Sequence, residues 1–445
     1  MFLVSMDTTF FNTVAPTHEL SPRTMSRGAD NSSGRPFDYL WMVALLWISG
    51  NPLFGAKPVM QPLVAILAFL LLALMLAKRV VFSKRDLWIF GSFGIIIVIQ
   101  VAGMESIGLL SVLGFFAKLM IAFAAVRLIR NFARVYVDVM FWTAMISFPF
   151  FALMIATQGR IADMIAPLSI NVPDPYFLVH YFASGHSLQN NSYFWEPGVY
   201  AGYLLLALAY LGAIKEHYSF RRYRFIVFVL LAAVATTQST GGYLVAPLAM
   251  IFHGKAIGKN MVFRAVLVLA ATVGLIFLFT SADFLGNKIR DQNQGVQGKG
   301  RGWQLTRLGS MIYDFRLIRQ RPLFGWGPDP DLQNGVVDRS VQVKEGNGLS
   351  NYTSHFGFFG MALFLAAAWI GFRNIFGGKG WLATLALIIA VVMLNDECFL
   401  SFPVYMSLMF LRGPTERSVG LSVGVGHAPD GQPPPAIPGP LNSAA

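Results

Sequence analysis

Residues 59–130 read VMQPLVAILAFLLLALMLAKRVVFSKRDLWIFGSFGIIIVIQVAGMESIGLLSVLGFFAKLMIAFAAVRLIR, and this stretch decides the fold. It contains three apolar runs, each close to the roughly 20 residues that a helix needs to cross a bilayer. The loop between the first two runs, residues 78–86, carries four Lys or Arg, whereas the next loop, residues 103–108, carries none. Lys and Arg concentrate in the cytoplasmic loops of membrane proteins. The pattern therefore predicts helices that cross a membrane in alternate directions, with the basic loops on one side.

The composition of the whole chain agrees with this stretch. Of its 445 residues, 55% are hydrophobic and 13% are charged, whereas a soluble protein carries about 25% charged residues. The mean hydropathy is +0.56. Backbone polar groups cannot be left unpaired in hydrocarbon, so apolar spans of this length must be helices. The composition predicts an all-α, polytopic transmembrane helix bundle.

Hydropathy places about twelve spans along the chain. They are expected at Leu40–Phe54, Val59–Ala77, Leu87–Gly103, Gly108–Val126, Tyr136–Ala156, Pro197–Ile214, Phe225–Thr237, Gly242–Phe252, Val262–Thr280, His355–Phe372, Trp381–Leu394 and Phe399–Leu411. Several are short, and re-entrant or broken helices are an alternative for these. The basic loops alternate with loops poor in Lys and Arg, and they are residues 78–86, 127–135, 215–224, 253–264 and 373–380. The positive-inside rule then predicts a multi-pass protein of the bacterial cytoplasmic (inner) membrane with both termini cytoplasmic.

Three regions follow from this topology. Residues 1–38 form a polar cytoplasmic segment that is expected to be disordered, and they show no signal peptide. Residues 39–411 form the transmembrane domain, whose two long loops, 157–196 and 281–354, face the periplasm or exterior; the second loop is expected to be partly helical. Residues 412–445 form a Pro/Gly-rich tail that is expected to be disordered in the cytoplasm.

The charges and the single cysteine exclude several classes of protein. The net charge of +12 does not argue for nucleic acid, because basic loops that face anionic lipid explain much of it. Cys398 is the only cysteine, so no intramolecular disulfide can form and a cysteine-based metal site is improbable. There is no P-loop, no GxGxxG after a strand and no cluster with metal-ligand spacing. The sequence therefore predicts no cofactor and no metal.

One candidate site opens the sixth span, where residues 191–200 read NSYFWEPGVY. Pro197 suits a first helical turn, and Glu196 precedes it at the positive end of the helix, where an anion is stabilised. Tyr193 and Trp195 are aromatic neighbours of this acid. The alternative is a helix cap with an aromatic belt at the membrane interface.

A second candidate joins spans seven and eight, where residues 236–242 read TTQSTGG. Ser239 and Thr240 lie at the start of a helix, where backbone N–H groups can bind an anion. The alternative, which is favoured for this motif alone, is a tight turn with small residues for helix packing.

The long loop 281–354 carries most of the external arginines. Arg301 and Arg307 bracket Trp303 in RGWQLTR, and a helical stretch with Arg316, Arg319 and Arg321 leads to Pro322-Leu-Phe-Gly-Trp-Gly327. Arginine binds phosphate through two parallel hydrogen bonds, and Trp303 and Trp326 are candidates to stack on sugars. The alternatives are a basic amphipathic helix on anionic headgroups and a structural turn.

The last candidate is residues 346–357, GNGLSNYTSHFG, which lead into the tenth span. Asn347, Asn351 and His355 are polar groups at a membrane boundary. The alternatives are an interfacial anchor for the histidine and helix caps for the asparagines.

In this order and on one side of the membrane, these motifs resemble the O-antigen ligase/polymerase family of membrane glycosyltransferases. The resemblance covers roughly residues 190–375. It implies an undecaprenyl-diphosphate-linked glycan as donor, used outside the cytoplasmic membrane without nucleotide sugar or essential metal. It also implies that Arg301 meets the diphosphate, that Glu196 is the family's acidic position and that Asn351 is the Asn of a His-Asn pair.

Two departures bear on the branch of the family. Ser350 stands where the ligases have the histidine of that pair, and Ser239-Thr240-Gly241 stands where many members have Ser-Arg-Gly. His355 is a candidate to replace the missing histidine. The departures favour a polymerase, or an exopolysaccharide relative, over a ligase.

The sequence thus predicts a polymerase that joins polyprenyl-diphosphate-linked glycan units into a surface polysaccharide or exopolysaccharide. The predicted catalytic residues are Glu196, Arg301, Asn351 and His355. The predicted substrate-binding residues are Arg307, Arg316, Arg319, Arg321, Tyr193, Trp195, Ser239, Thr240, Trp303, Trp326 and Asn347. Expected partners are the lipid-linked donor, a glycan acceptor, the bilayer and other polysaccharide-assembly membrane proteins, but no nucleic acid. The alternatives are a ligase that transfers glycan to lipid A core or protein, a transporter of lipid-linked glycan, and a non-catalytic assembly partner.

Overall fold

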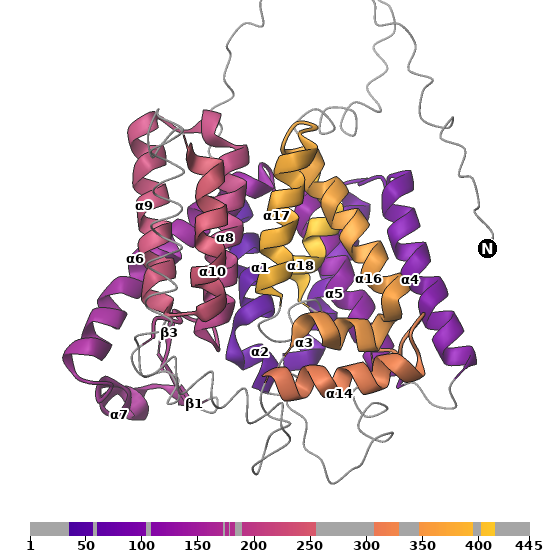
Figure 1. Cartoon of the computed structure of the whole chain (residues 1–445), viewed down its shortest axis with the longest axis horizontal. Helices are drawn as coiled ribbons and strands as arrows, with labels where there is room; N and C mark the ends of the chain where they lie inside the picture. Colours follow the sequence, from indigo (N-terminus) through magenta and orange to yellow (C-terminus); the bar gives the residue numbers. More distant parts are fainter. Residues whose placement is uncertain are drawn as a thin grey trace, which may run out of the picture. The chain divides into compact units, whose positions relative to one another are not determined.

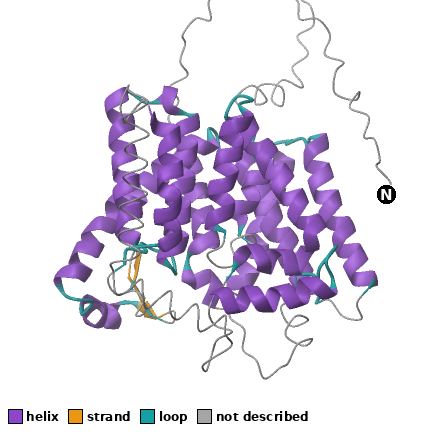
Figure 2. Ribbon diagram, in the orientation of Figure 1, coloured by secondary structure: helices purple, strands orange, loops and turns teal. Residues whose placement is uncertain are grey.

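The chain folds as a bundle of helices (Figures 1 and 2). The structure is a computed structural model, and it describes residues 35–56, 60–103, 108–171, 174–177, 179–182, 189–254, 307–328, 347–394 and 402–413. The α-helices are α1 (Pro36–Gly50), α2 (Pro52–Ala56), α3 (Met60–Ala77), α4 (Lys84–Ala102), α5 (Leu109–Leu128), α6 (Phe132–Ala156), α7 (Ile161–Ile165), α8 (Pro197–Ala213), α9 (Phe220–Thr237), α10 (Thr240–Met250), α14 (Arg307–Gln320), α16 (Gly348–Ile375), α17 (Gly380–Met393) and α18 (Pro403–Ser407). Short 3-10 turns lie at Ala166–Leu168, Lys215–His217, Ile251–His253 and Leu408–Phe410. The prediction of a helical membrane protein is confirmed at this level.

The predicted count of twelve spans is not confirmed. Among the described residues, four helices are long and apolar enough to cross a membrane, namely α4, α5, α6 and α16. The first expected span is broken at Asn51, whose side chain accepts a hydrogen bond from the N–H of Leu53 at 2.9 Å and so starts α2. The expected span Val262–Thr280 lies outside the described residues.

Helix α8 is the centre of the bundle. Fifteen of its 17 residues are buried, because α6, α9, α10 and α17 pack around it. Figure 1 shows α8 beside α9 and α10. The aromatic core continues from Tyr203 of α8 to Tyr405 of α18, whose ring centroids lie 5.7 Å apart. Helix α8, whose N-terminus carries the Glu196 motif, is therefore held by these neighbouring helices.

Two buried carboxylates near helix ends bind basic side chains, and the predicted sidedness of the basic loops stays a prediction. Asp86 accepts hydrogen bonds from Arg127 and from Arg412, the latter at 3.3 Å between Nη2 and Oδ2. Asp138 of α6 lies 3.8 Å from Nη2 of Arg222, which belongs to another basic loop. Asp86 and Asp138 are both buried. These ion pairs hold several of the basic side chains close to the helix ends.

A small antiparallel sheet, which the all-α prediction does not include, lies in the long loop that follows α6. It has the order β1 (Ile170–Asn171), β2 (Pro175–Phe177), β3 (His180–Tyr181), with Tyr176 opposite both Ile170 and Tyr181. His180 is fully buried, and its ring stacks on Phe150 of α6 at 5.3 Å between centroids. Burial lowers the pKa of His180 to about 3. The sheet is thus attached to α6 by a neutral histidine.

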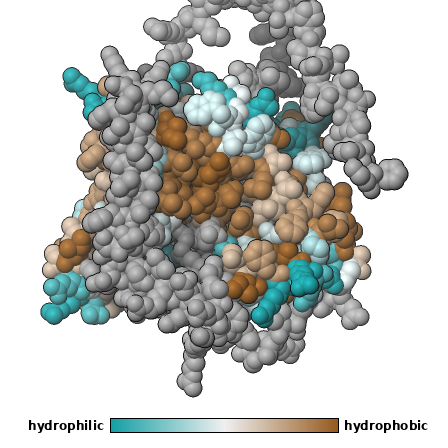
Figure 3. Space-filling view, in the orientation of Figure 1, coloured by the Kyte–Doolittle hydropathy of each residue, from teal (hydrophilic) through white to brown (hydrophobic). Residues whose placement is uncertain are grey.

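The surface agrees with a membrane-embedded bundle. Figure 3 shows a broad hydrophobic band across the helices, with more hydrophilic colours toward the two ends. Side chains that are both large and apolar are exposed along α4, among them Ile95 at 62% and Val98 at 67%. Water would penalise such exposure, whereas lipid does not.

Candidate functional site

The expected tenth span is a broken helix. Helix α16 contains Gly357 with φ 67° and ψ −178°, a conformation that only glycine adopts readily. The break leaves backbone groups without partners inside the helix, and the turn that contains Pro322 and Leu323 binds them. The N–H of Phe358 donates to the Pro322 carbonyl at 2.8 Å, and the N–H of Phe359 donates to the Leu323 carbonyl at 3.1 Å. The PLFGWG motif is therefore a docking turn for the break.

The same turn binds the carbonyls on the other side of the break. Trp326 N–H donates to the Ser354 carbonyl at 2.9 Å, and Gly327 N–H donates to the His355 carbonyl at 2.8 Å. The His355 carbonyl also accepts from the Gln100 side chain of α4 at 2.8 Å. The carbonyl groups that the break exposes thus receive hydrogen bonds from the Gln100 side chain and from the backbone of the turn. In hydrocarbon, such backbone groups must be paired.

Close packing at the turn requires a second glycine. Gly325 has φ 70°, and a Cβ there would overlap the backbone of His355 and Ser354. The alternative interpretation of PLFGWG as a structural turn is confirmed by these contacts.

Helix α14 packs against the first half of α16 through a buried polar pair. The Ser350 hydroxyl donates to Oδ2 of Asp314 at 2.5 Å, and both residues are buried. The side chain of Asn347 accepts from the N–H of Ser350 at 3.1 Å and so caps α16. Burial raises the pKa of the neighbouring Tyr313, and the charge of Asp314 adds to the shift. An acidic group of α14 is therefore held inside the interface between α14 and α16.

His355 lies at the edge of this interface and is half-buried. Its Nδ1 is 2.5 Å from the Gly327 carbonyl oxygen. A carbonyl oxygen only accepts, so the hydrogen is assigned to Nδ1 in neutral His355, which leaves Nε2 as an acceptor. Asn351, one helical turn earlier, is buried.

The arginines in and around α14 differ in their surroundings. Arg316 and Arg319 are exposed on α14. Arg321 covers the ring of Trp326 at 4.5 Å and donates from Nη2 to the Gly103 carbonyl at 3.1 Å. Trp326 is itself buried and donates from its indole to the Leu317 carbonyl at 3.0 Å. Arg301 and Trp303 lie outside the described residues, and only the backbone of Arg307 is described.

The Glu196 motif forms a second group of residues. Glu196 is the N-cap residue of α8 and is half-buried, but its side chain makes no cap hydrogen bond. Glu196 therefore occupies the N-cap position, but its carboxylate does not cap α8 through a hydrogen bond. Tyr193 is buried between the rings of Trp47 and Phe194. The ring centroids of Trp195 and Phe402 lie 5.1 Å apart.

Asn190 connects this group to the TTQSTGG turn. Its side chain donates to Ser147 of α6 at 2.9 Å and to Thr236 of α9 at 3.0 Å, and Ser147 lies 3.3 Å from the hydroxyl of Tyr200. Ser239 accepts from the N–H of Gly242 at 3.2 Å and caps α10. The turn alternative for this motif is confirmed, and Thr240 is the first residue of α10.

The predicted residues thus fall into two groups. Asn347, Asn351, His355, Arg321 and Trp326 gather on α14, the docking turn and α16. Glu196, Tyr193, Trp195, Ser239 and Thr240 gather around the starts of α8 and α10. Their roles toward a substrate stay predictions.

Three residues that hold these contacts, Asp314, Gln100 and Asn190, were not predicted from the sequence. Asp314 had a signal, because Ser310, Tyr313, Asp314 and Leu317 repeat at helical spacing and all are buried. Gln100 and Asn190 gave no such signal. Within the described ranges, no group of three or more His, Cys, Asp or Glu could hold a metal ion.

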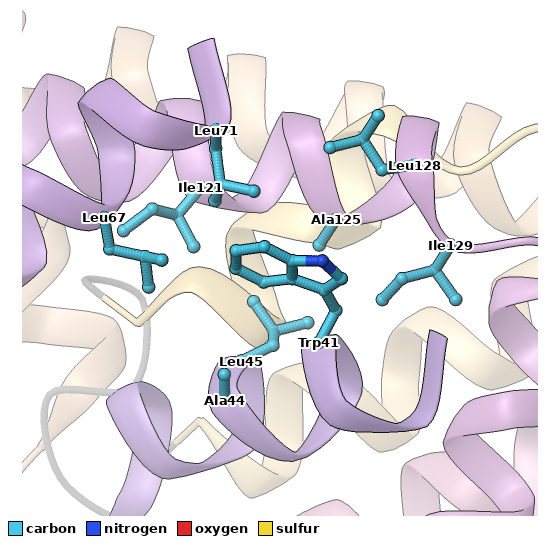
Figure 4. A pocket seen from close by; sticks show the side chains of 9 residues that line it. All are labelled: Trp41, Ala44, Leu45, Leu67, Leu71, Ile121, Ala125, Leu128 and Ile129. Atoms are coloured by element: carbon cyan, nitrogen blue, oxygen red, sulfur yellow. The ribbon is translucent and has the colours of Figure 1, made fainter. Parts of the chain in front are cut away.

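A pocket elsewhere in the bundle does not suit a charged substrate. It lies between α1, α3 and α5, and Figure 4 shows the Trp41 indole surrounded by aliphatic side chains. All nine lining residues are apolar: Trp41, Ala44, Leu45, Leu67, Leu71, Ile121, Ala125, Leu128 and Ile129. A diphosphate would find no counter-charge there.

Comparison with known proteins gives one match, which covers about a third of the chain. A protein-family model described as O-antigen ligase matches residues 225–365, which run from α9 into α16. No curated protein and no solved structure matches the chain. The matched segment contains Asp314, the docking turn and the break in α16.

Proposed function

We propose that this chain, whose residues 225–365 support its assignment to the O-antigen ligase/polymerase family, is a polysaccharide polymerase. It would join polyprenyl-diphosphate-linked glycan units on the outer face of the bacterial cytoplasmic membrane. The observation that carries the proposal is the α14–α16 interface. An external helix is fixed on a broken membrane helix by the Asp314–Ser350 hydrogen bond, inside the matched segment.

The proposed reaction is an inverting glycosyl transfer. A hydroxyl of the acceptor sugar attacks C1 of the donor sugar, the C1–O bond to the diphosphate breaks, and the polyprenyl diphosphate leaves with the bonding electrons. Glu196 would take the proton of the acceptor hydroxyl. Glu196 is half-buried at the start of α8, and its Oε2 atom is buried, so an acceptor would have to reach the carboxylate from its other oxygen.

The leaving group determines what the arginines do. Negative charge grows on the diphosphate as the C1–O bond breaks, and preorganised guanidinium groups stabilise it. Arg301 would make the main contact, with Arg307 beside it and with Arg316, Arg319 and Arg321 as further positive charge. Asn351 and His355 would orient sugar hydroxyls from the first half of α16, together with Asn347.

The remaining predicted substrate contacts are aromatic and hydroxyl groups. Tyr193, Trp195, Trp303 and Trp326 would contact sugar rings, and Ser239 and Thr240 would lie beside the diphosphate at the start of α10. Tyr193 and Trp326 are buried, so a sugar would reach their rings only after local movement. No metal and no cofactor takes part in the proposed reaction.

A ligase is the second candidate, because the matching family model is described as O-antigen ligase. Ser350 speaks against it, since its hydroxyl is bound to Asp314 where the resemblance expects a histidine. The two reactions share the donor and differ in the acceptor.

The deciding experiment is a gel and mass profile of surface glycan and lipid-linked intermediates in a strain that lacks the gene. Loss of polymer with accumulation of single units on the lipid diphosphate supports the polymerase. Full-length polymer that stays on the lipid carrier indicates the ligase, and units that stay on the cytoplasmic side indicate a transporter. Complementation with Arg301→Ala should fail and with Arg301→Lys should be partial, because lysine lacks the planar fork of arginine. Near-normal polymer from Arg301→Ala, at equal protein levels, would contradict the assigned role.

A further inference from the structure

A contact of Arg321 indicates the depth at which α14 lies along the membrane normal. Helix α4 has 19 residues, about 28 Å at the usual rise, which is close to the roughly 30 Å of a hydrocarbon core. It begins beside the buried ion pair of Asp86 and Arg127 and is followed by Gly103. Arg321 donates to the Gly103 carbonyl at 3.1 Å. The end of α14 therefore lies where α4 leaves the hydrocarbon, and Figure 1 shows α14 lying across the helix ends.

Helix α14 has two different faces. Tyr313, Asp314, Leu317 and Ile318 are buried against the bundle. The opposite face exposes Phe315 together with Arg316, Arg319 and Gln320. Asp314 is the only acidic residue within 307–328, and its burial leaves the outward face with positive charge alone.

An exposed apolar patch adjoins this basic face. Leu323 is 62% exposed, Phe358 is 55% exposed and Phe359 is 52% exposed. The backbone hydrogen bonds between Pro322 and Phe358 and between Leu323 and Phe359 hold the three side chains in one region. Figure 3 shows hydrophilic and hydrophobic surface side by side at the end of the bundle where α14 lies.

We propose that the outward face of α14, together with the patch of Leu323, Phe358 and Phe359, is a membrane-interface surface on which Arg316 and Arg319 bind the phosphates of anionic bilayer lipids. Charge complementarity and the level of Gly103 favour the bilayer over a protein partner. Apolar side chains can enter the acyl region, while the long arginine side chains reach back to the headgroups. Arg316 and Arg319 are also assigned to the donor diphosphate in the proposed reaction. The two roles agree because both kinds of phosphate lie in the headgroup layer, and lipid binding does not require the reaction to take place.

The experiment uses the full chain with Cys398→Ser and one new cysteine, labelled with bimane. The test positions are Phe315→Cys and Leu323→Cys. The references are Val98→Cys, which faces outward from α4 five residues before Gly103, and Lys379→Cys in a basic loop. The protein is reconstituted into vesicles of phosphatidylcholine alone or with phosphatidylglycerol, and quenching by doxyl-lipid is compared with quenching by aqueous iodide.

The expected result is that the Leu323→Cys label behaves like Val98→Cys, with lipid quenching and protection from iodide. Phosphatidylglycerol should increase lipid quenching at Phe315→Cys. Arg316→Gln with Arg319→Gln should abolish that increase, whereas Gln320→Ala on the same face should retain it. Iodide quenching of both test labels equal to that of Lys379→Cys would overturn the proposal. Lipid contact without any effect of the arginine substitutions would overturn the binding of phosphates.

Discussion

Replacing Gly357 by alanine should disrupt the break in α16 and release the docking turn. The φ of 67° and ψ of −178° cost a non-glycine residue about 1–3 kcal/mol. The new Cβ would also overlap the Leu323 carbonyl, which endangers the hydrogen bonds donated by Phe358 and Phe359. Each such bond contributes about 1 kcal/mol, so we expect a total loss of about 3–5 kcal/mol. That is a large part of the roughly 5–15 kcal/mol by which a typical protein is stable.

The assay is the melting temperature of the purified protein in detergent, followed by circular dichroism and by tryptophan fluorescence, to which Trp326 contributes. Gly94→Ala is the matched control, because Gly94 is helical and a Cβ there meets nothing within 4 Å. Alanine favours a helix over glycine, so the control should melt at the wild-type temperature or slightly above it. If the melting temperature of Gly357→Ala equals that of Gly94→Ala, the positive φ at position 357 is wrong, and so is the expected loss of stability.

Two further perturbations test the polar contacts. Ser350→Ala should lower the free energy of unfolding by about 1.5–3 kcal/mol, because it removes a hydroxyl donor from the buried Asp314 carboxylate. The loss should be smaller in an Asp314→Asn background. Additive losses in this double-mutant cycle would contradict an interaction between the two side chains. Stability should fall as the pH is lowered from about 6.5 toward 3. The reason is that burial lowers the pKa of folded His180 to about 3, so the unfolded chain binds the proton first. Denaturation at several pH values should show a weaker dependence for His180→Phe but not for His217→Phe, whose histidine is exposed, and equal slopes in both variants would refute the assignment to His180.

Hydropathy predicted the long helices well because lipid-facing side chains must be apolar whatever the helices pack against. The expected span Val59–Ala77 became α3 (Met60–Ala77), and Pro197–Ile214 became α8 (Pro197–Ala213). The same signal failed at the start of α16. Residues 348–354 are polar enough to resemble a loop, yet they are helical because Asn347 caps them and α14 covers them.

The candidate site was predicted in its motifs but not in its contacts. The glycines and the aromatic residues of PLFGWG marked a turn, but nothing in the sequence identified its partner as the break at Gly357, 30 or more positions away. Asp314 was overlooked for a physical reason: an acidic residue in a long loop between membrane spans usually lies in water, and only the packing of α14 on α16 buries it beside Ser350.

The break at Gly357 also explains how one helix can serve both the membrane and a polar site. Residues 358–375 span about 27 Å and suffice to cross the hydrocarbon. Residues 348–356 would project about 13 Å further into water if the helix continued straight. Because the chain turns at Gly357, this polar half-helix is instead packed on α14, whose end Arg321 fixes at Gly103. Asn351, His355 and the arginine face of α14 are therefore kept near the headgroup level. A lipid-linked diphosphate carries its reactive bond at that same level, because its polyprenyl chain cannot leave the bilayer and its glycan cannot enter it.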